Sequence, residues 1–80
     1  MPRFFFHLHD CVDKLLDSEG RIMPLEAVAD AALLQARDCI AGDVMTGRLD
    51  LHSRIDVHDE ADKIIHSTRF EDALEIIPPP

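Results

Sequence analysis

Residues 24–47 read PLEAVADAALLQARDCIAGDVMTG and predict a single long helix. Pro24 fits the first turn, where its missing N–H costs nothing, and Gly47 fits the position after the last turn. Between them, from Leu25 to about Met45, there is no proline, and alanine and leucine are frequent. Helical spacing places one set of apolar residues on a single stripe: Leu25, Val28, Ala29, Ala32, Leu33, Ala36, Cys39 and Ile40. Such a stripe must be buried, and its alanines allow close contact with a sheet.

The segments on either side of this helix predict β-strands. Residues 3–9 (RFFFHLH) are rich in strand formers, and alternation turns Phe4, Phe6 and Leu8 to one face. Residues 54–58 (RIDVH) alternate with Ile55 and Val57 inward. The polar link 59–62 joins them to the run 63–70 (KIIHSTRF), which predicts a β-hairpin. Residues 10–23 hold turn formers around a short apolar run, as expected for two turns and a brief strand.

These elements predict an α+β fold in the order β-(β)-α-β-β. One long helix packs on a small antiparallel sheet, which is made from the N-terminal strand and the C-terminal hairpin. We expect a single domain over residues 1–77 and an exposed proline tail at residues 78–80. The expected core consists of Phe4, Phe6, Leu8, Val28, Ala32, Ala36, Ile40, Ile55, Val57, Ile64 and Phe70.

Charge and composition exclude several classes of partner. The 80 residues carry 16 Asp+Glu against 8 Lys+Arg, a formal net charge of −8. Affinity for nucleic acid comes mainly from Lys and Arg, so binding to DNA, RNA or an anionic membrane is disfavoured. The hydrophobic content of 46% is too high for a disordered acidic tail, and no apolar run is long enough to span a bilayer. No signal peptide is evident, so no secretion is expected.

The two cysteines favour a reducing, cytoplasmic location. They lack the CxxC spacing of a zinc ribbon or a thiol redox site, and two are too few for a disulfide-stapled secreted domain. Cys11 falls in a predicted turn and is expected to be exposed and oxidisable. Cys39 falls on the helix stripe and is expected to be inert packing.

Histidines form the one constellation that suggests a metal. His7 and His9 share a strand face, and His58 points the same way if residues 54–58 form the neighbouring strand. Three imidazoles on one open face could bind Zn²⁺ or Ni²⁺, with Asp56 as a carboxylate ligand beside them. The simpler interpretation is a polar solvent face, because alternation alone produces an H-x-H pattern. No cofactor is expected.

Enzymatic activity is not predicted. The nucleotide, phosphate and hydrolase fingerprints GxGxxG, GxxxxGK[ST], GxSxG and HExxH are absent, and the scattered acids define no catalytic pair. The remaining class is a non-catalytic interaction or regulatory module, acting through a protein partner or self-association. Four apolar residues are expected to point away from the core, Phe5 and Ile65 from the sheet and Leu34 and Met45 from the helix. Isolated surface apolar residues are the simpler alternative.

Several motifs together resemble one family. They are Met-Pro-Arg-Phe-Phe-Phe-His-Leu at residues 1–8, Asp-Ser-Glu-Gly at 17–20, Leu-Glu-Ala at 25–27, Arg-Ile-Asp-Val at 54–57 and Phe-Glu-Asp-Ala-Leu at 70–74. The set is similar to the DUF6894-type family of small bacterial proteins of unknown function, which is abundant in rhizobia and other alphaproteobacteria. The resemblance covers nearly the whole chain and implies no activity, ligand or catalytic residue. Ala61-Asp62 departs from the family pattern, where Asp-Gly is common, so the hairpin turn lacks a glycine for positive φ.

Overall fold

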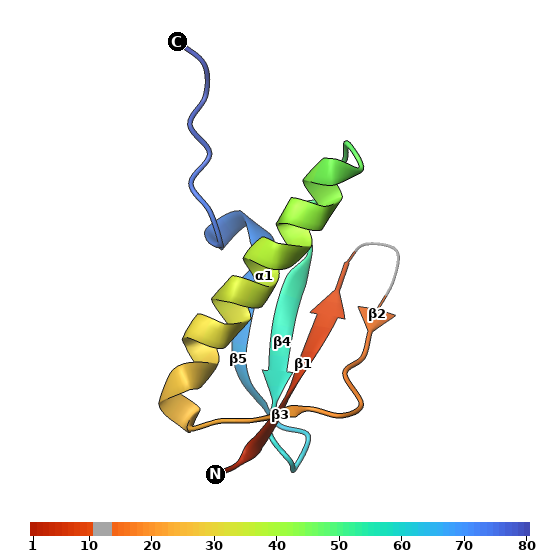
Figure 1. Cartoon of the computed structure of the whole chain (residues 1–80), viewed down its shortest axis with the longest axis vertical. Helices are drawn as coiled ribbons and strands as arrows, with labels where there is room; N and C mark the ends of the chain where they lie inside the picture. The colour runs from red at the N-terminus through yellow and green to blue at the C-terminus, as the bar shows by residue number, and fades with distance from the viewer. Residues whose placement is uncertain (11–13) are drawn as a thin grey trace.

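The computed structural model describes residues 1–10 and 14–80 and has the predicted α+β architecture (Figure 1). Cys11, for which exposure and oxidation were expected, lies outside the described residues. In chain order the elements are β1 (Arg3–His9), β2 (Lys14–Leu15), β3 (Arg21–Ile22), the 3₁₀ turn η1 (Leu25–Ala27), α1 (Val28–Met45), β4 (Arg54–His58), β5 (Ile64–Arg69) and the 3₁₀ turn η2 (Phe70–Asp72).

Within the described residues the sheet has five antiparallel strands, four of them in the order β2-β1-β4-β5. The brief strand expected within residues 10–23 is in fact two, because β2 pairs with the end of β1 at Leu8 and His9 while β3 pairs with its start at Arg3 and Phe4. Both therefore occupy the same edge of β1. The opposite edge of β1 pairs with β4, with Phe6 opposite Val57.

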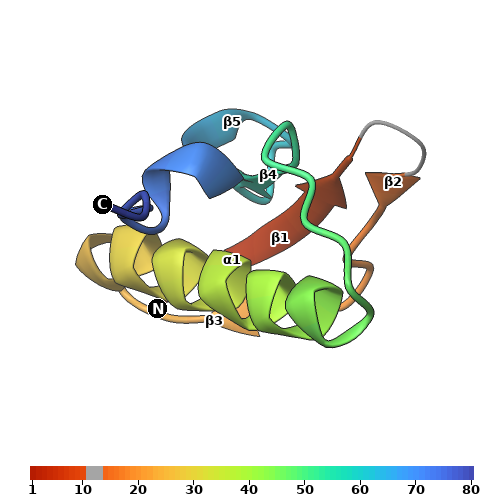
Figure 2. The same cartoon turned by 90° about the horizontal axis from the view of Figure 1, so that it is seen from above.

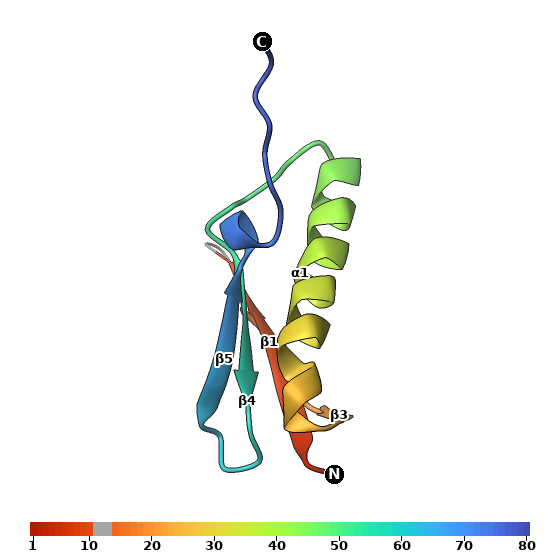
Figure 3. The ribbon, with the colours of Figure 1, turned by 90° about the vertical axis from the view of Figure 1, so that its left-hand side faces the viewer.

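Helix α1 lies against one face of the sheet, as the side view shows (Figure 3). Its ends agree with the sequence, since Pro24 precedes η1 with φ −68° and Gly47 follows α1 with φ +82°. The side chains that α1 buries recur at every fourth residue, Val28, Ala32, Ala36 and Ile40. No helix among residues 1–10 and 14–80 is long and apolar enough to cross a membrane.

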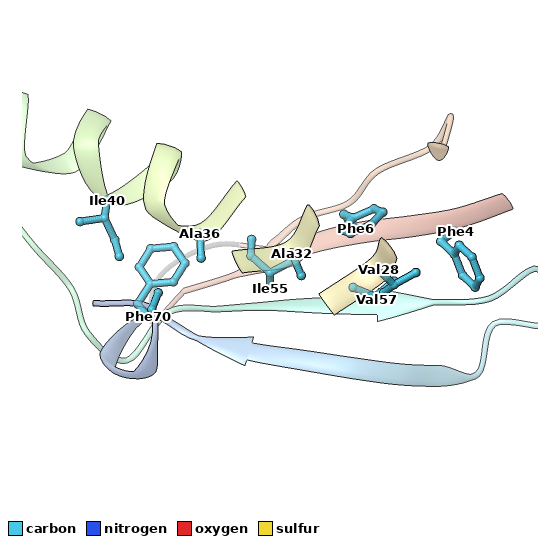
Figure 4. Packing of buried hydrophobic residues seen from close by; sticks show 10 residues of the cluster. Phe4, Phe6, Val28, Ala32, Ala36, Ile40, Ile55, Val57 and Phe70 are labelled. Carbon is cyan, nitrogen blue, oxygen red and sulfur yellow. The ribbon is translucent and has the colours of Figure 1, made fainter. Parts of the chain in front are cut away.

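The hydrophobic core contains all but two of the expected residues and adds Ala73 (Figure 4). Its buried members are Phe4, Phe6, Val28, Ala32, Ala36, Ile40, Ile55, Val57, Phe70 and Ala73. Leu8 is only partly buried, and the prediction for Ile64 is wrong, because its side chain is 55% exposed. The register of β4 and β5 shifts between Val57 and His58, so alternation along β5 does not continue to its first residue.

The chain leaves the packed body just after η2. The Phe70 amide donates to the Ser53 carbonyl at 2.9 Å, and Nε of Arg37 donates to the Ala73 carbonyl at 2.7 Å. The first bond ties η2 to the segment before β4, and the second ties Ala73, the last buried residue, to the helix. Beyond it, residues 75–80 are exposed and extend away from the body (Figure 1).

Candidate functional site

A groove runs between α1 and the strands at the β2 end of the sheet. It consists of two adjoining hollows of about 400 and 610 Å³, which share Arg21, Gln35 and Cys39 as lining residues. We call it the leucine groove, because leucines line both walls: Leu8, Leu15 and Leu16 on the sheet side and Leu34 on the helix. Leu15, Leu16 and Leu34 are each at least 60% exposed. The groove therefore presents a concave apolar surface to solvent.

The groove exists because one helix is narrower than the sheet beneath it. Helix α1 packs mainly against β4 and β5. Four strands side by side span roughly 14 Å between their outer axes, whereas a helix with its side chains is about 10 Å across. The top view shows β2 at the opposite end of the sheet from β5 (Figure 2). The β2 end of the helix-side face is thus left without a helix among the described residues, while Phe4 and Phe6 of β1 remain buried in the core.

The rim of the groove is acidic. Asp17 and Glu19 lie on the sheet side and Asp38 on the helix side. Arg21 is the one base among the described lining residues, and its guanidinium carbon lies 4.5 Å above the centre of the Phe6 ring. This cation–π contact covers part of the apolar floor while leaving the rim with a net negative charge.

Cys39 lines the groove as a half-buried thiol. Burial raises its pKa, and the nearby Asp38 and Asp43 carboxylates add to the rise. The thiol is therefore protonated at neutral pH and poorly nucleophilic, as expected for a packing residue.

A second cluster lies at the hairpin end of the sheet. His7, His58 and Asp62 each bring a potential ligand atom within 4.8 Å of the others. The two imidazole rings meet edge to face, with centroids 4.6 Å apart, and Nδ1 of His58 lies 2.8 Å from Oδ1 of Asp62. Asp62 reaches His58 from the hairpin turn, where it adopts φ +62° in the place of a glycine. Sequence reasoning missed Asp62, although the turn itself was predicted.

One potential ligand atom of His7 already accepts a hydrogen bond within the fold. Nδ1 of His7 accepts the Asp17 amide N–H at 3.0 Å, so the neutral ring carries its proton on Nε2. The Asp17 carboxylate in turn accepts hydrogen bonds from the backbone amides of Phe6, Glu19 and Gly20 at 3.0–3.2 Å. Burial alone would raise the pKa of Asp17, but these three hydrogen bonds hold it below its ordinary value.

His9 lies apart from the other two sequence-predicted histidines. Its Nε2 lies 3.4 Å from Oδ2 of Asp56 and has no hydrogen-bond partner among the described residues. Burial lowers the pKa of His9, and this effect outweighs the opposing influence of Asp56. The structure brings His7 and His58 together and leaves His9 beside Asp56.

Asp56 is a buried structural carboxylate rather than an open ligand. Nε of Arg54 lies 3.1 Å from both carboxylate oxygens of Asp56 and donates to them. The Ser67 hydroxyl donates a further hydrogen bond to Oδ1 of this buried carboxylate. Burial raises the pKa of Asp56, but these hydrogen bonds and the Arg54 charge bring it below its ordinary value. The ligand role expected for Asp56 therefore does not fit, because its oxygens are occupied within the fold.

The four residues expected at an interaction surface do not lie together. Leu34 is exposed on the wall of the leucine groove, and Met45 is exposed at the end of α1, outside the groove. Phe5 and Ile65 are both half-buried, and Ile65 packs against the core cluster. Of the four, Leu34 alone contributes to the groove.

Comparison with known proteins identifies one family model. It is described as a domain of unknown function, DUF6894, and matches residues 3–71. No curated protein and no solved structure matches the chain.

Proposed function

The chain belongs to the DUF6894 family, a domain of unknown function, and from this premise we propose that it is a non-catalytic protein-interaction module. The observation that carries the proposal is the leucine groove, where three exposed leucines surround one concave surface. Full burial of a leucine side chain contributes about 1.5–3 kcal/mol, so a partner seated in the groove gains stability from each of them. Scattered apolar residues would offer no such common surface.

The perturbed carboxylates support a non-catalytic role. A strongly perturbed group in a cleft is often catalytic, and Asp17 and Asp56 both have lowered pKa values. Here, however, each carboxylate accepts hydrogen bonds from the fold around it. Their perturbation is explained by structural roles, so neither group is left for acid–base chemistry.

We further propose a cytoplasmic location, on the basis of the cysteine usage, and an alphaproteobacterial origin, on the basis of the family resemblance.

The test is a paired affinity purification of the full-length chain. Tagged wild type, Leu34→Asp and Ile77→Asp are each incubated with an alphaproteobacterial lysate, and bound proteins are quantified by mass spectrometry. Ile77 is exposed on the tail, so its variant adds the same charge outside the groove. We expect the recovery of a specific partner to fall about tenfold with Leu34→Asp, equivalent to about 1.4 kcal/mol of binding free energy. Its recovery should be unchanged with Ile77→Asp. Equal recovery from both variants, with circular dichroism unchanged, would refute the proposal.

Metal binding is a second candidate function, favoured by the convergence of His7, His58 and Asp62. Zn²⁺ or Ni²⁺ suits such a set of two imidazoles and a carboxylate. Metal binding at either ring nitrogen of His7 would disturb the hydrogen bond from the Asp17 amide, because Nδ1 would hold the metal or carry the ring proton. NMR titration with Zn²⁺ would then shift the His7 and His58 rings and the Asp17 amide, and leave the exposed His52 ring in place. Absence of these shifts at submillimolar metal removes this candidate.

A further inference from the structure

We propose that the occupant of the leucine groove is a basic amphipathic helix of a protein partner. This inference rests on the proposed interaction function and names the chemistry of the partner. Two features of the groove carry it: the composition of its helix wall and the charge of its rim.

The sheet continues beyond the strands that α1 mainly contacts. Helix α1 occupies the β4–β5 half of the face, and the side view shows the sheet and α1 as two layers (Figure 3). The leucine groove lies beside α1, toward β2. A helix placed there would complete the two-layer arrangement by which a sheet face is normally buried.

The wall that α1 offers has the side chains of a helix–helix contact. Ala31, Leu34, Gln35 and Asp38 line it at spacings of three and four residues. Residues at these spacings form the ridge of a helix, into which a second helix packs at an axial separation of 8–10 Å. Ala31 is small and permits close approach, while Leu34 supplies apolar area. The leucines of the sheet wall, Leu15 and Leu16, face the same space.

The charge of the rim selects a basic partner. Asp17, Glu19 and Asp38 border the groove against the single base Arg21, and the whole chain carries −8. A helix with lysines or arginines beside its apolar stripe would meet complementary charge, which raises association rates and specificity. A second copy of this chain would instead bring another −8 to the interface and be repelled. Charge therefore favours a different, basic protein over self-association.

The test uses a synthetic probe and the full-length chain. The probe is a labelled amphipathic peptide of about 18 residues, built from leucine and lysine with leucine at helical spacing. Its control carries glutamate in place of lysine. Fluorescence anisotropy should show saturable binding of the lysine peptide that weakens with added salt, and binding of the glutamate peptide at least tenfold weaker.

Variants locate the binding. Leu34→Asp should lower the affinity for the lysine peptide at least tenfold. Ile77→Asp adds the same charge on the exposed tail and should leave this affinity within twofold of the wild type. Neutralising the rim in Glu19→Gln/Asp38→Asn should lower affinity and reduce the salt dependence. Glu26→Gln/Glu75→Gln removes the same charge from exposed positions outside the groove. This control should change the affinity and its salt dependence less than the rim variant does.

Three results would overturn the inference. Equal affinity for the two peptides would show that rim charge does not select the partner. Equal weakening by Leu34→Asp and Ile77→Asp would show non-specific attraction to the acidic surface. A dimer seen by light scattering, and abolished by Leu34→Asp, would make a second copy the occupant. If the lysine peptide fails to bind while lysate recovery still distinguishes Leu34→Asp from Ile77→Asp, the basic-helix inference fails and the interaction function stands.

Discussion

At the scale of single residues, polar groups on the sheet are held by specific partners. Asp17 accepts three backbone amides and donates its own to His7, which ties the β2–β3 connection to β1. At the centre of β4, the Asp56 carboxylate accepts hydrogen bonds from the Arg54 and Ser67 side chains. Each carboxylate is stabilised in its charged form, so both pKa values are lowered. Acid should therefore loosen this side of the sheet.

His9 makes the first part of that acid response testable. Because the pKa of His9 in the folded state lies below its ordinary value of 6.5, the neutral form of the ring favours folding. The resulting stability is present above pH 6.5 and is lost as the pH falls through the folded pKa. We expect the urea midpoint of the wild type to decrease between about pH 7 and pH 5, and His9→Gln to remove part of that decrease.

His52→Gln is the matched control, since the His52 ring is exposed. A wild-type midpoint that rises on acidification over this range would contradict the role given to His9. A further decrease, shared by the wild type and His9→Gln, should follow at lower pH, because the pKa values of Asp17 and Asp56 lie below their ordinary value of 3.8.

At the scale of elements, local signals predicted the helix and the hairpin, and glycines mark where backbone geometry is demanding. Gly20 ends the turn before β3 with φ +73°, and a Cβ there would lie 2.9 Å from the Phe4 carbonyl and from atoms of Arg3 and Phe5. Gly42 is helical, with nothing within 4 Å of such a Cβ. One glycine is required and the other is replaceable.

Opposite effects of the same substitution are expected at these two sites. Gly42→Ala should raise the free energy of unfolding by about 0.5–1 kcal/mol, because alanine restricts the unfolded chain and favours the helix. Gly20→Ala should lower it by more than about 1 kcal/mol, because of the left-handed φ and the clash with backbone. Thermal melts of both variants measure this. A Gly20→Ala variant as stable as the wild type would show that the turn relaxes freely.

The register of the hairpin shows the limit of element-scale reasoning. Alternation along residues 63–70 placed Ile64 in the core, yet the shift between Val57 and His58 exposes it. Periodicity assumes unbroken pairing, and a bulge is a property of two strands together. The same turn brings Asp62 to His58, a contact that no spacing within either strand could reveal.

At the scale of the whole molecule, folding stability should reside in residues before the exposed tail. Phe70 and Ala73 are buried, whereas Ile76 and Ile77 are exposed. Deleting residues 75–80 should therefore leave the melting temperature nearly unchanged. Phe70→Ala should cost about 3–5 kcal/mol, a large share of the stability of a small domain. A clear loss of stability on deleting the tail would show that it packs on the body in solution.

The sequence by itself determined the element types, the helix ends, most of the core and the acidic exterior. Those features follow from local propensity, turn residues and periodicity, which act within a few neighbouring residues. Tertiary structure alone decided that α1 sits over β4 and β5, and thus that a leucine groove opens beside it. It also decided that His7 and His58 meet Asp62, while His9 meets Asp56. These outcomes depend on strand register and on the lateral position of a helix, which are set by contacts between residues distant in the chain.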